Sequence, residues 1–251
     1  MRLQAGSLHA GRAAELDSAF RSLHPTERLQ RLRAEIQGEL VFTTSFGLED
    51  QVLLHLIAGS GIPVSVVTLD TGRLFPETYE LWARSERRYG IAIRPFYPQA
   101  GALEALVAAQ GINGFYASKA ARMSCCGVRK LEPLGRALHG ASGWITGLRA
   151  DQSAARNQMT FVSWDAERAL LKANPLLDWS RERTAAFARD EIVPINPLHQ
   201  QGYASIGCAP CTRAIGPGEP ERAGRWWWEQ DGSQECGLHL SADGRLVRAG
   251  S

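Results

Sequence analysis

Residues 40–57 read LVFTTSFGLEDQVLLHLI, and this stretch decides the fold. Residues 40–44 are apolar or β-branched and predict a strand, which ends at the turn Ser45-Phe46-Gly47. The mainly apolar residues from 50 to 57 then predict a buried helix. A strand joined to a helix by so short a turn is the repeating unit of parallel α/β folds.

The same alternation continues along the chain. A strand is predicted over residues 64–69, a helix from Pro76 to about residue 89, where Gly90 stops it, and a strand over 91–96. Strands and helices that alternate with short connections predict an α/β fold with a single open, mainly parallel sheet flanked by helices. We further expect helices over 103–109, 120–138 (kinked or split at Pro133) and 181–190, and a strand over 144–147, while residues 169–173 form another apolar run.

Three segments are expected in the chain. Residues 1–38 carry apolar side chains at helical spacing, interrupted at Pro25, and predict an N-terminal helical segment. Residues 39–213 form the α/β domain. Residues 214–251 are rich in Gly, Trp and charged residues, which predicts an irregular, mobile C-terminal tail.

The composition excludes several classes of protein. With 44% hydrophobic and 22% charged residues, the chain of 251 residues is neither disordered nor fibrous. Its net charge of +2 provides no basic field for nucleic acid, and no apolar run is long enough to cross a membrane. The first residues lack the apolar core of a secretory signal, so we expect a cytoplasmic protein.

Polar turns follow three of the predicted strands, at residues 45–50, 70–73 and 146–149. In open parallel sheets, ligands bind beyond the carboxyl ends of the strands, where helix N-termini hold anions. Gly47 lets the backbone approach a phosphate, and Ser45 adds a hydroxyl donor. Asp70 can accept from ribose hydroxyls or an adenine amine, and Arg149 supplies a cationic fork for an anion. The three turns together predict a nucleotide site.

Four of the five cysteines fall into two tight pairs, Cys125-Cys126 and Cys208-x-x-Cys211, 82 positions apart. Because the thiolate is a soft ligand, this set suits Zn²⁺ or an iron–sulfur cluster. Adjacent cysteines reach one tetrahedral ion poorly but can serve separate irons of a [4Fe–4S] cluster, and only the second pair has the spacing usual in zinc modules.

The fifth cysteine, Cys236, lies apart from the others. Arg222, Arg225 and His239 are close to it in sequence, and nearby positive charge favours the nucleophilic thiolate. A thiolate on a flexible arm can react over a bound nucleotide and then reach a protein partner. We expect the three tryptophans at 226–228 to anchor this arm on the domain.

In this order, the motifs resemble those of the assimilatory sulfonucleotide reductases, and within that family the iron–sulfur branch, adenylylsulfate (APS) reductase. The resemblance runs from about residue 40 to residue 240. It is carried by S-F-G-L-E-D at 45–50, L-D-T-G at 69–72, C-C-x-x-x-K at 125–130, T-G-L-R at 146–149 with Q-S at 152–153, C-x-x-C at 208–211, E-R-x-G-R-W-x-W-E at 221–229 and E-C-G-L-H at 235–239.

The resemblance implies a fold similar to the PP-loop ATP pyrophosphatases, of the adenine nucleotide alpha hydrolase-like type. Those enzymes carry S-G-G-x-D-S, whereas this loop has Phe46 at the first glycine and Glu49-Asp50 at Asp-Ser, which argues against ATP hydrolysis. The AMP part of a sulfonucleotide is instead implied to lie across Ser45, Gly47, Asp70, Thr71, Gly147 and Arg149.

The resemblance also implies that Cys125, Cys126, Cys208 and Cys211 hold a [4Fe–4S] cluster. Because reduction of a sulfonate by two thiols needs no one-electron carrier, we expect the role of this cluster to be structural and electrostatic. The Cys236 thiolate would attack the sulfur of APS, expel AMP and form a thiosulfonate, from which thioredoxin releases sulfite for cysteine biosynthesis. Because both reactants are anionic, we expect Lys130, Arg222 and Arg225 to act as catalytic cations, with His239 assisting the thiolate or orienting the sulfonate.

Three alternatives stay open. The nearest is a reductase of the 3′-phosphorylated substrate PAPS, or an enzyme of dual specificity, although the cysteine quartet favours APS. A PP-loop tRNA-thiolating enzyme would have an intact ATP-pyrophosphatase loop and a basic surface. A non-enzymatic iron–sulfur redox sensor would not depend on Cys236. We expect no nucleic-acid or membrane partner, while the tryptophans at 226–228 leave a homo-oligomer open.

Overall fold

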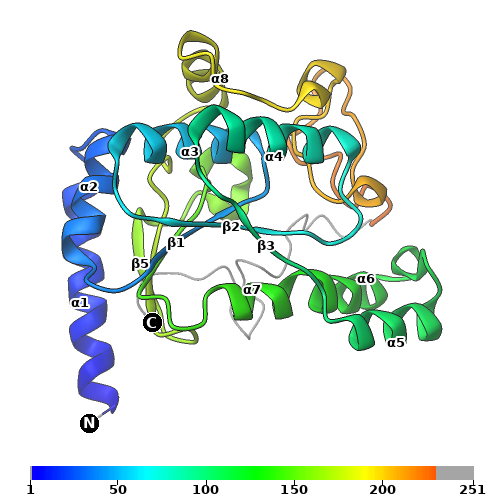
Figure 1. The fold of residues 1–251 in the computed structure, drawn as a ribbon, viewed down its shortest axis with the longest axis horizontal. Helices are drawn as coiled ribbons and strands as arrows, with labels where there is room; N and C mark the ends of the chain where they lie inside the picture. Colours follow the sequence, from blue (N-terminus) through cyan, green and yellow to red (C-terminus); the bar gives the residue numbers. More distant parts are fainter. Residues whose placement is uncertain (1, 230–251) are drawn as a thin grey trace.

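A computed structural model describes residues 2–229 of the chain, with one six-stranded sheet at its centre (Figure 1). The strands are β1 (Leu40–Thr44), β2 (Ser65–Leu69), β3 (Arg94–Phe96), β4 (Gly143–Ile145), β5 (Val162–Asp165) and β6 (Leu170–Ala173). Their order is β3-β2-β1-β4-β6-β5, in which only the β5–β6 pair is antiparallel. The predicted open, mainly parallel sheet is confirmed.

Helices cover both faces of this sheet (Figure 1). On one face, Phe42 of β1 belongs to a core with residues of the first three helices, and on the other, Val41 packs with Leu134 and Trp144. The alternation follows from the two-residue period of a strand. The α-helices are α1 (Arg2–Phe20), α2 (Pro25–Glu35), α3 (Leu48–Ser60), α4 (Pro76–Tyr89), α5 (Ala100–Gln110), α6 (Lys119–Cys126), α7 (Glu132–Ala137) and α8 (Arg181–Asp190).

The edge strand β5 was not predicted from the sequence. It pairs with β6 through Val162↔Ala173 and Asp165↔Leu170. The Asp165 carboxylate accepts hydrogen bonds from the backbone and side-chain nitrogens of Arg168, which closes the turn between the two strands. Residues 162–165 read VSWD and alternate apolar and polar side chains, which is the pattern of a strand, so the signal was present and was overlooked.

The helix expected over 120–138 is interrupted before Pro133, not at it. α6 ends at Cys126, a π-helical segment η2 (Gly127–Leu131) follows, and α7 begins at Glu132. Proline lacks an N–H group and its ring collides with the carbonyl four residues earlier, so the preceding turn widens. As a result, Lys130 lies in an irregular turn.

The segment 214–229 is irregular, as expected, and packs on the α/β domain. Thr212 and Arg225 form an antiparallel bridge, and the Trp226 amide donates to the Cys211 carbonyl at 3.2 Å. The Trp226 side chain is buried. The rest of the expected tail, residues 230–251, lies outside the described residues.

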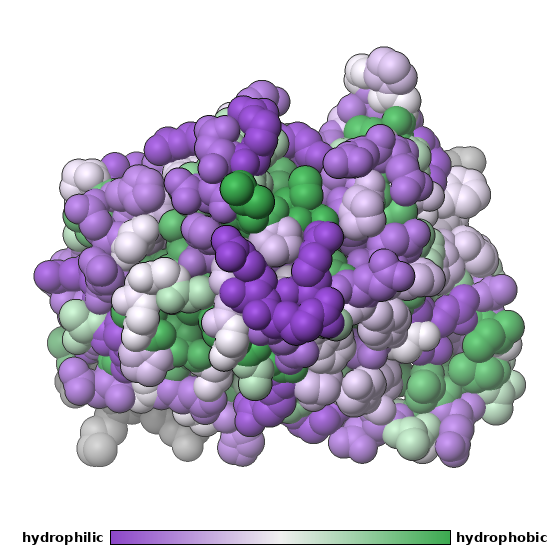
Figure 2. Space-filling model, turned by 45° about the horizontal axis from the view of Figure 1, so that its top comes forward, coloured by the Kyte–Doolittle hydropathy of each residue, from purple (hydrophilic) through white to green (hydrophobic). Residues whose placement is uncertain are grey.

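One face of the molecule is largely polar. Hydrophilic residues cover most of the face shown in Figure 2, and hydrophobic residues form separate patches between them. Within the described part of the chain, every helix is too short or too polar to span a bilayer.

Candidate functional site

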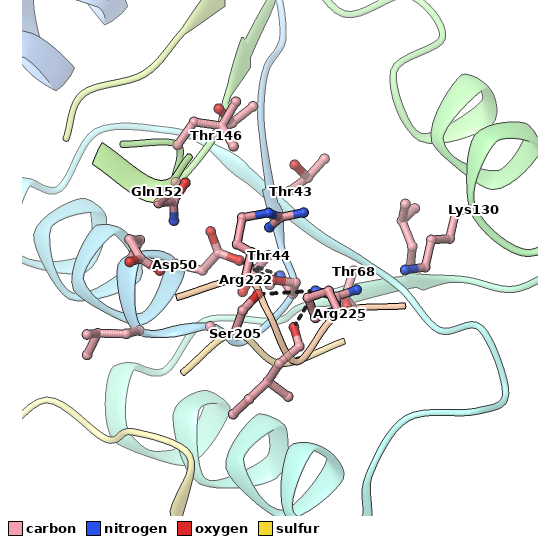
Figure 3. A pocket seen from close by; sticks show the side chains of 18 of the residues that line it. Thr43, Thr44, Asp50, Thr68, Lys130, Thr146, Gln152, Ser205, Arg222 and Arg225 are labelled. Carbon is pink, nitrogen blue, oxygen red and sulfur yellow. Dashed lines mark hydrogen bonds between the residues drawn. The ribbon is translucent and has the colours of Figure 1, made fainter. Parts of the chain in front are cut away.

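A cavity lies at the carboxyl ends of the parallel strands (Figure 3). The turn after β1 contributes Ser45 and Gly47 to its wall, Thr71 follows β2, and Gly147 follows β4. The three polar turns therefore meet at one place, because the carboxyl ends of parallel strands share one edge of the sheet.

Cationic side chains from separate parts of the chain line this cavity. Lys130 comes from η2, Arg156 from a short 3-10 turn (Ala154–Arg156), and Arg222 and Arg225 from the C-terminal segment. Lys130, Arg222 and Arg225 lie around the same space in Figure 3. The sequence analysis missed Arg156, although it follows the Q-S motif at 152–153 and donates to the side chain of Gln152.

Arg225 is held by its surroundings on several sides. Its Nη1 donates to the Ser205 hydroxyl at 3.3 Å and to the Ile206 carbonyl at 3.4 Å, and its guanidinium lies 4.8 Å from the centre of a Trp226 ring. Its Nε atom is buried and has no hydrogen-bond partner among the described residues. A buried donor of this kind suits an anionic ligand in the cavity.

The wall also has an acidic side, formed by the first turn of α3. The Asp50 carboxylate accepts from the Ser45 amide at 2.6 Å and from the Ser45 hydroxyl at 2.7 Å. Burial nevertheless raises the pKa of Asp50 to about 6, and the neighbouring Glu49 adds to the shift. Gly147 is required here, since a Cβ atom would lie 3.1 Å from Cβ of Glu49 and even closer to the Asp50 carboxylate.

Arg149, predicted to supply a cationic fork for an anion, binds carboxylates in the structure. Its side chain is wholly buried, and its guanidinium binds Glu49 at 2.7 Å, Glu221 at 2.8 Å and Asp151. A buried guanidinium needs counter-charges, and here three carboxylates supply them. Glu49 and Glu221 themselves line the cavity, so Arg149 joins α3 to the C-terminal segment from behind the wall.

Asp70 is also placed differently from the expectation. Its carboxylate accepts from the Gly72 amide and from the Tyr79 hydroxyl, both at 2.8 Å, and is not part of the described cavity wall. Asp70 therefore fixes the turn after β2. The adjacent Thr71 is the residue of this turn that reaches the cavity, and its hydroxyl lies 3.2 Å from Sγ of Cys208.

The four paired cysteines line a second, smaller cavity. Cys125 and Cys126 end α6, whereas Cys208 precedes and Cys211 ends a short 3-10 turn, and none of the four is in a disulfide. Lys130 lines both this cavity and the larger one. Within residues 2–229, no three His, Cys, Asp or Glu side chains are arranged to hold a single metal ion.

The surroundings of this second cavity act unequally on the thiols that line it. Burial opposes ionisation of Cys208, yet Lys130, the Thr71 hydroxyl and Arg225 together lower the pKa of this thiol. Burial raises the pKa of Cys211 to about 12, with Cys208 acting in the same direction. The thiols therefore differ in how readily each becomes a thiolate.

Aromatic rings enclose the cysteines. Trp226 lines the cavity, and Phe115 and Trp228 pack beside it with their rings 6.3 Å apart. Arg122 of α6 stacks on Trp226 and binds Glu229 at 2.8 Å, which ties the C-terminal segment to the helix of Cys125 and Cys126. The expectation that the tryptophans at 226–228 anchor the segment holds for Trp226, while the Trp227 ring is half-exposed.

Cys236 and His239, the predicted nucleophile and its neighbour, lie outside the described residues. The segment that leads to them begins at the site, because Arg222, Arg225 and Trp226 line the two cavities. Their roles stay predictions.

Most of the chain is similar in sequence to proteins of one known family. The model of the phosphoadenosine phosphosulfate reductase domain matches residues 39–214. An adenosine 5′-phosphosulfate reductase of Agrobacterium fabrum is 54% identical over 228 residues, which cover 91% of this chain and 87% of the relative. A protein of the same name from Allochromatium vinosum is 54% identical over 213 residues, 85% of this chain and 83% of that one.

Among solved structures, phosphoadenylyl-sulfate (PAPS) reductase from Candida auris, in a phosphate complex, is similar to this fold. The TM-score is 0.69 at 25% sequence identity, and the match covers 81% of this chain and 96% of the other.

Proposed function

The chain belongs to the phosphoadenosine phosphosulfate reductase family, and from this premise we propose that it reduces APS to sulfite and AMP with thioredoxin as electron donor. It is accordingly an oxidoreductase that acts on a sulfur group, in assimilatory sulfate reduction and cysteine biosynthesis. Its near relatives carry the name of that activity over most of their length. Because the chemistry needs reduced thiols, we place the enzyme in the cytoplasm.

One observation carries the proposal. The cavity at the strand ends, lined by Lys130, Arg156, Arg222 and Arg225, adjoins the cysteine cavity, and Lys130 belongs to both. An anionic thiolate can approach an anionic sulfonucleotide only where fixed positive charge offsets their repulsion. The arrangement supplies this charge at the edge of the sheet where nucleotides bind.

We assign the second cavity to a [4Fe–4S] cluster. Four thiol side chains line it, which is the donor number and type that such clusters require, and Arg129 and Lys130 beside them would offset the negative charge of the thiolates. When bound, the cluster would supply a fixed anionic centre and cross-link α6 to the chain around Cys208. Lys130, next to both cavities, would then be held toward the substrate.

The reaction proceeds through residues of this chain and two thiols of thioredoxin. The Cys236 thiolate attacks the sulfur of APS, an S–S bond forms, and the S–O bond breaks with its electron pair leaving on the phosphate of AMP. A thioredoxin thiolate then attacks Sγ of Cys236 and expels sulfite, and the second thioredoxin thiol restores the Cys236 thiolate and leaves an oxidised disulfide. Lys130, Arg222 and Arg225 offset charge on phosphate and sulfonate, and His239 orients the sulfonate.

Trapping the intermediate tests the function. Incubation with APS in the absence of thioredoxin should add one SO₃ group to Cys236, detected by mass spectrometry of the peptide, and reduced thioredoxin should release it as sulfite. Cys236→Ser should carry no adduct and make no sulfite. Sulfite production by Cys236→Ser at the wild-type rate would refute the mechanism.

PAPS is the second candidate substrate. The family model and the similar solved structure both carry the name of the PAPS-reducing activity. Measuring kcat/KM with each nucleotide separates the two, and a higher value for PAPS would reverse the assignment. Whether the chain forms a homo-oligomer stays a prediction, which sedimentation would check.

A further inference from the structure

His199 lines the cavity at the strand ends, and one of its ring nitrogens is buried without a hydrogen-bond partner among the described residues. It belongs to a 3-10 turn (Pro197–Gln201), and its half-buried ring lines the cavity. Its Nδ1 atom lies 2.8 Å from the carbonyl oxygen of Tyr203. Because a carbonyl oxygen only accepts, Nδ1 must carry the proton of this bond.

The other ring nitrogen has no such partner. Nε2 is buried, and within residues 2–229 nothing bonds to it. Burial lowers the pKa of His199 below its ordinary value, and Arg181 acts in the same direction, against Glu49 and the bond to Tyr203. A neutral ring with its proton on Nδ1 leaves a lone pair on Nε2, and a buried acceptor without a partner is costly.

We propose that Nε2 of His199 accepts a hydrogen bond from the nucleoside part of the substrate and thereby helps to select it. This inference rests on the proposed function, because it requires a nucleotide in the cavity. The sulfate and phosphate groups of the substrate are acceptors, whereas the nucleoside offers donors: the 2′-hydroxyl, the 3′-hydroxyl and the adenine amino group.

Two unpartnered atoms of opposite kind support the assignment. Arg225 and His199 both line the cavity; the buried Nε of Arg225 is a donor and suits an oxygen of the anion, while the buried Nε2 of His199 is an acceptor and suits a neutral donor. The wall can therefore bind the two ends of a sulfonucleotide by different chemistry. A site that pairs a buried acceptor with a substrate donor rejects analogues that lack the donor.

Two substitutions separate the ring nitrogens. The amide of Asn reaches the position of Nδ1, so His199→Asn retains the bond to Tyr203 and removes the acceptor. The amide of Gln reaches the position of Nε2, so His199→Gln restores an acceptor and loses the bond to Tyr203. We expect the Kd of AMP, measured by calorimetry, to rise about 3- to 10-fold in His199→Asn and to return close to the wild-type value in His199→Gln.

Analogues of AMP that each lack one nucleoside donor identify the group that binds Nε2 of His199. Wild-type protein should bind one of 2′-deoxy-AMP, 3′-deoxy-AMP and purine riboside monophosphate more weakly than AMP, by the factor that separates His199→Asn from wild type in the Kd of AMP. His199→Asn should bind that analogue as tightly as it binds AMP. An unchanged Kd in His199→Asn, equal weakening in both variants, or wild-type protein that binds all analogues like AMP would overturn the inference. Failure of the wild-type protein to bind AMP would refute the proposed function, and this inference with it.

Discussion

At the scale of single residues, the site depends on where side chains are missing as much as on where they are present. A Cβ atom at position 207 would lie 2.6 Å from Cζ of Arg225 and closer still to one of its terminal nitrogens. Gly207 therefore leaves the space through which Arg225 reaches the cavity. Gly147 likewise leaves the space that Glu49 and Asp50 in the first turn of α3 occupy.

Gly207→Ala should displace the guanidinium of Arg225 and lower kcat/KM for APS on the order of 10²-fold, since a catalytic group is misplaced by roughly an ångström. Steady-state kinetics of the variant measures this loss. Gly135→Ala in α7 is the matched control, because a Cβ atom there meets no atom within 4 Å. The control should keep its activity and gain ~0.5–1 kcal/mol of stability. Full activity in Gly207→Ala would mean that Arg225 is not needed where it lies.

Asp50 predicts a pH dependence of stability. Its pKa is raised from 3.8 to about 6 in the folded chain, so the folded state binds more protons than the unfolded state between these values. The stabilisation from the protonated carboxyl is fully present below pH 3.8 and is lost as the pH rises through about 6. Across the full shift, the free energy of unfolding falls by about 3 kcal/mol as the pH rises, and about half of this loss occurs between pH 5 and pH 7.5.

Urea denaturation of wild-type protein and Asp50→Asn at pH 5 and pH 7.5 checks this. The wild type should lose stability relative to Asp50→Asn as the pH rises, because the amide does not ionise. Asp190→Asn, at an exposed position on α8, should follow the wild type. Parallel curves for wild type and Asp50→Asn would show that Asp50 does not titrate in this range.

At the scale of elements, the short helix α6 carries two of the four proposed cluster ligands. α6 has eight residues, and its last turn carries Cys125 and Cys126. Its N-cap Ser118 accepts from the Ala121 amide at 3.1 Å. α8 is capped in the same way by Ser180, which accepts from the Arg183 amide at 3.1 Å.

The two caps make a matched pair of variants. Ser118→Ala and Ser180→Ala should each cost about 1 kcal/mol of stability, measured by thermal unfolding. Only Ser118→Ala should also lower the iron content per chain, because only α6 carries proposed cluster ligands. Equal iron loss in both variants would show that general destabilisation, and not the geometry of α6, controls cluster retention.

At the scale of the whole molecule, the site joins segments that are far apart in the chain. The residues of the two cavities include members of β1, β2 and β4 and of the turns after them, of α6 and η2, of the turn with Gln152 and Arg156, and of the chain from His199 to Trp226. The sheet has its own core, built around β1 and its neighbours. The cysteine cavity has a small separate core of Phe115, Cys208, Cys211 and Trp226.

Anaerobic removal of iron by a chelator should therefore loosen one part of the molecule and spare the other. Amide hydrogen exchange should rise in α6 and in residues 205–229, while β1, β2 and β4 keep their protection. Cys236→Ser, which leaves the four proposed ligands in place, should show the wild-type pattern before and after chelation. Uniform loss of protection, or none, would contradict the proposed structural role of the cluster.

The sequence predicted those features that repeat along the chain. Alternating apolar runs and polar turns were enough for the parallel sheet and for the convergence of Ser45, Gly47, Thr71 and Gly147 at its carboxyl edge. β5 was missed although its residues alternate apolar and polar side chains, and the π-helical segment was missed because proline perturbs the turn before it. Arg156 was missed because one arginine among many in a polar loop gives no periodic signal.

The sequence by itself determined the order of strands and helices, the cysteine quartet and the family, because these follow from local spacing and from motifs in linear order. Only the tertiary structure decided what each charged group faces. Arg149 and Asp70 look like ligand-binding residues in the sequence, yet burial surrounds the first with carboxylates and gives the second an amide and a hydroxyl to bind. A charged group binds whatever the fold brings within a few ångströms, and two of the carboxylates around Arg149, those of Glu49 and Glu221, lie far away along the chain.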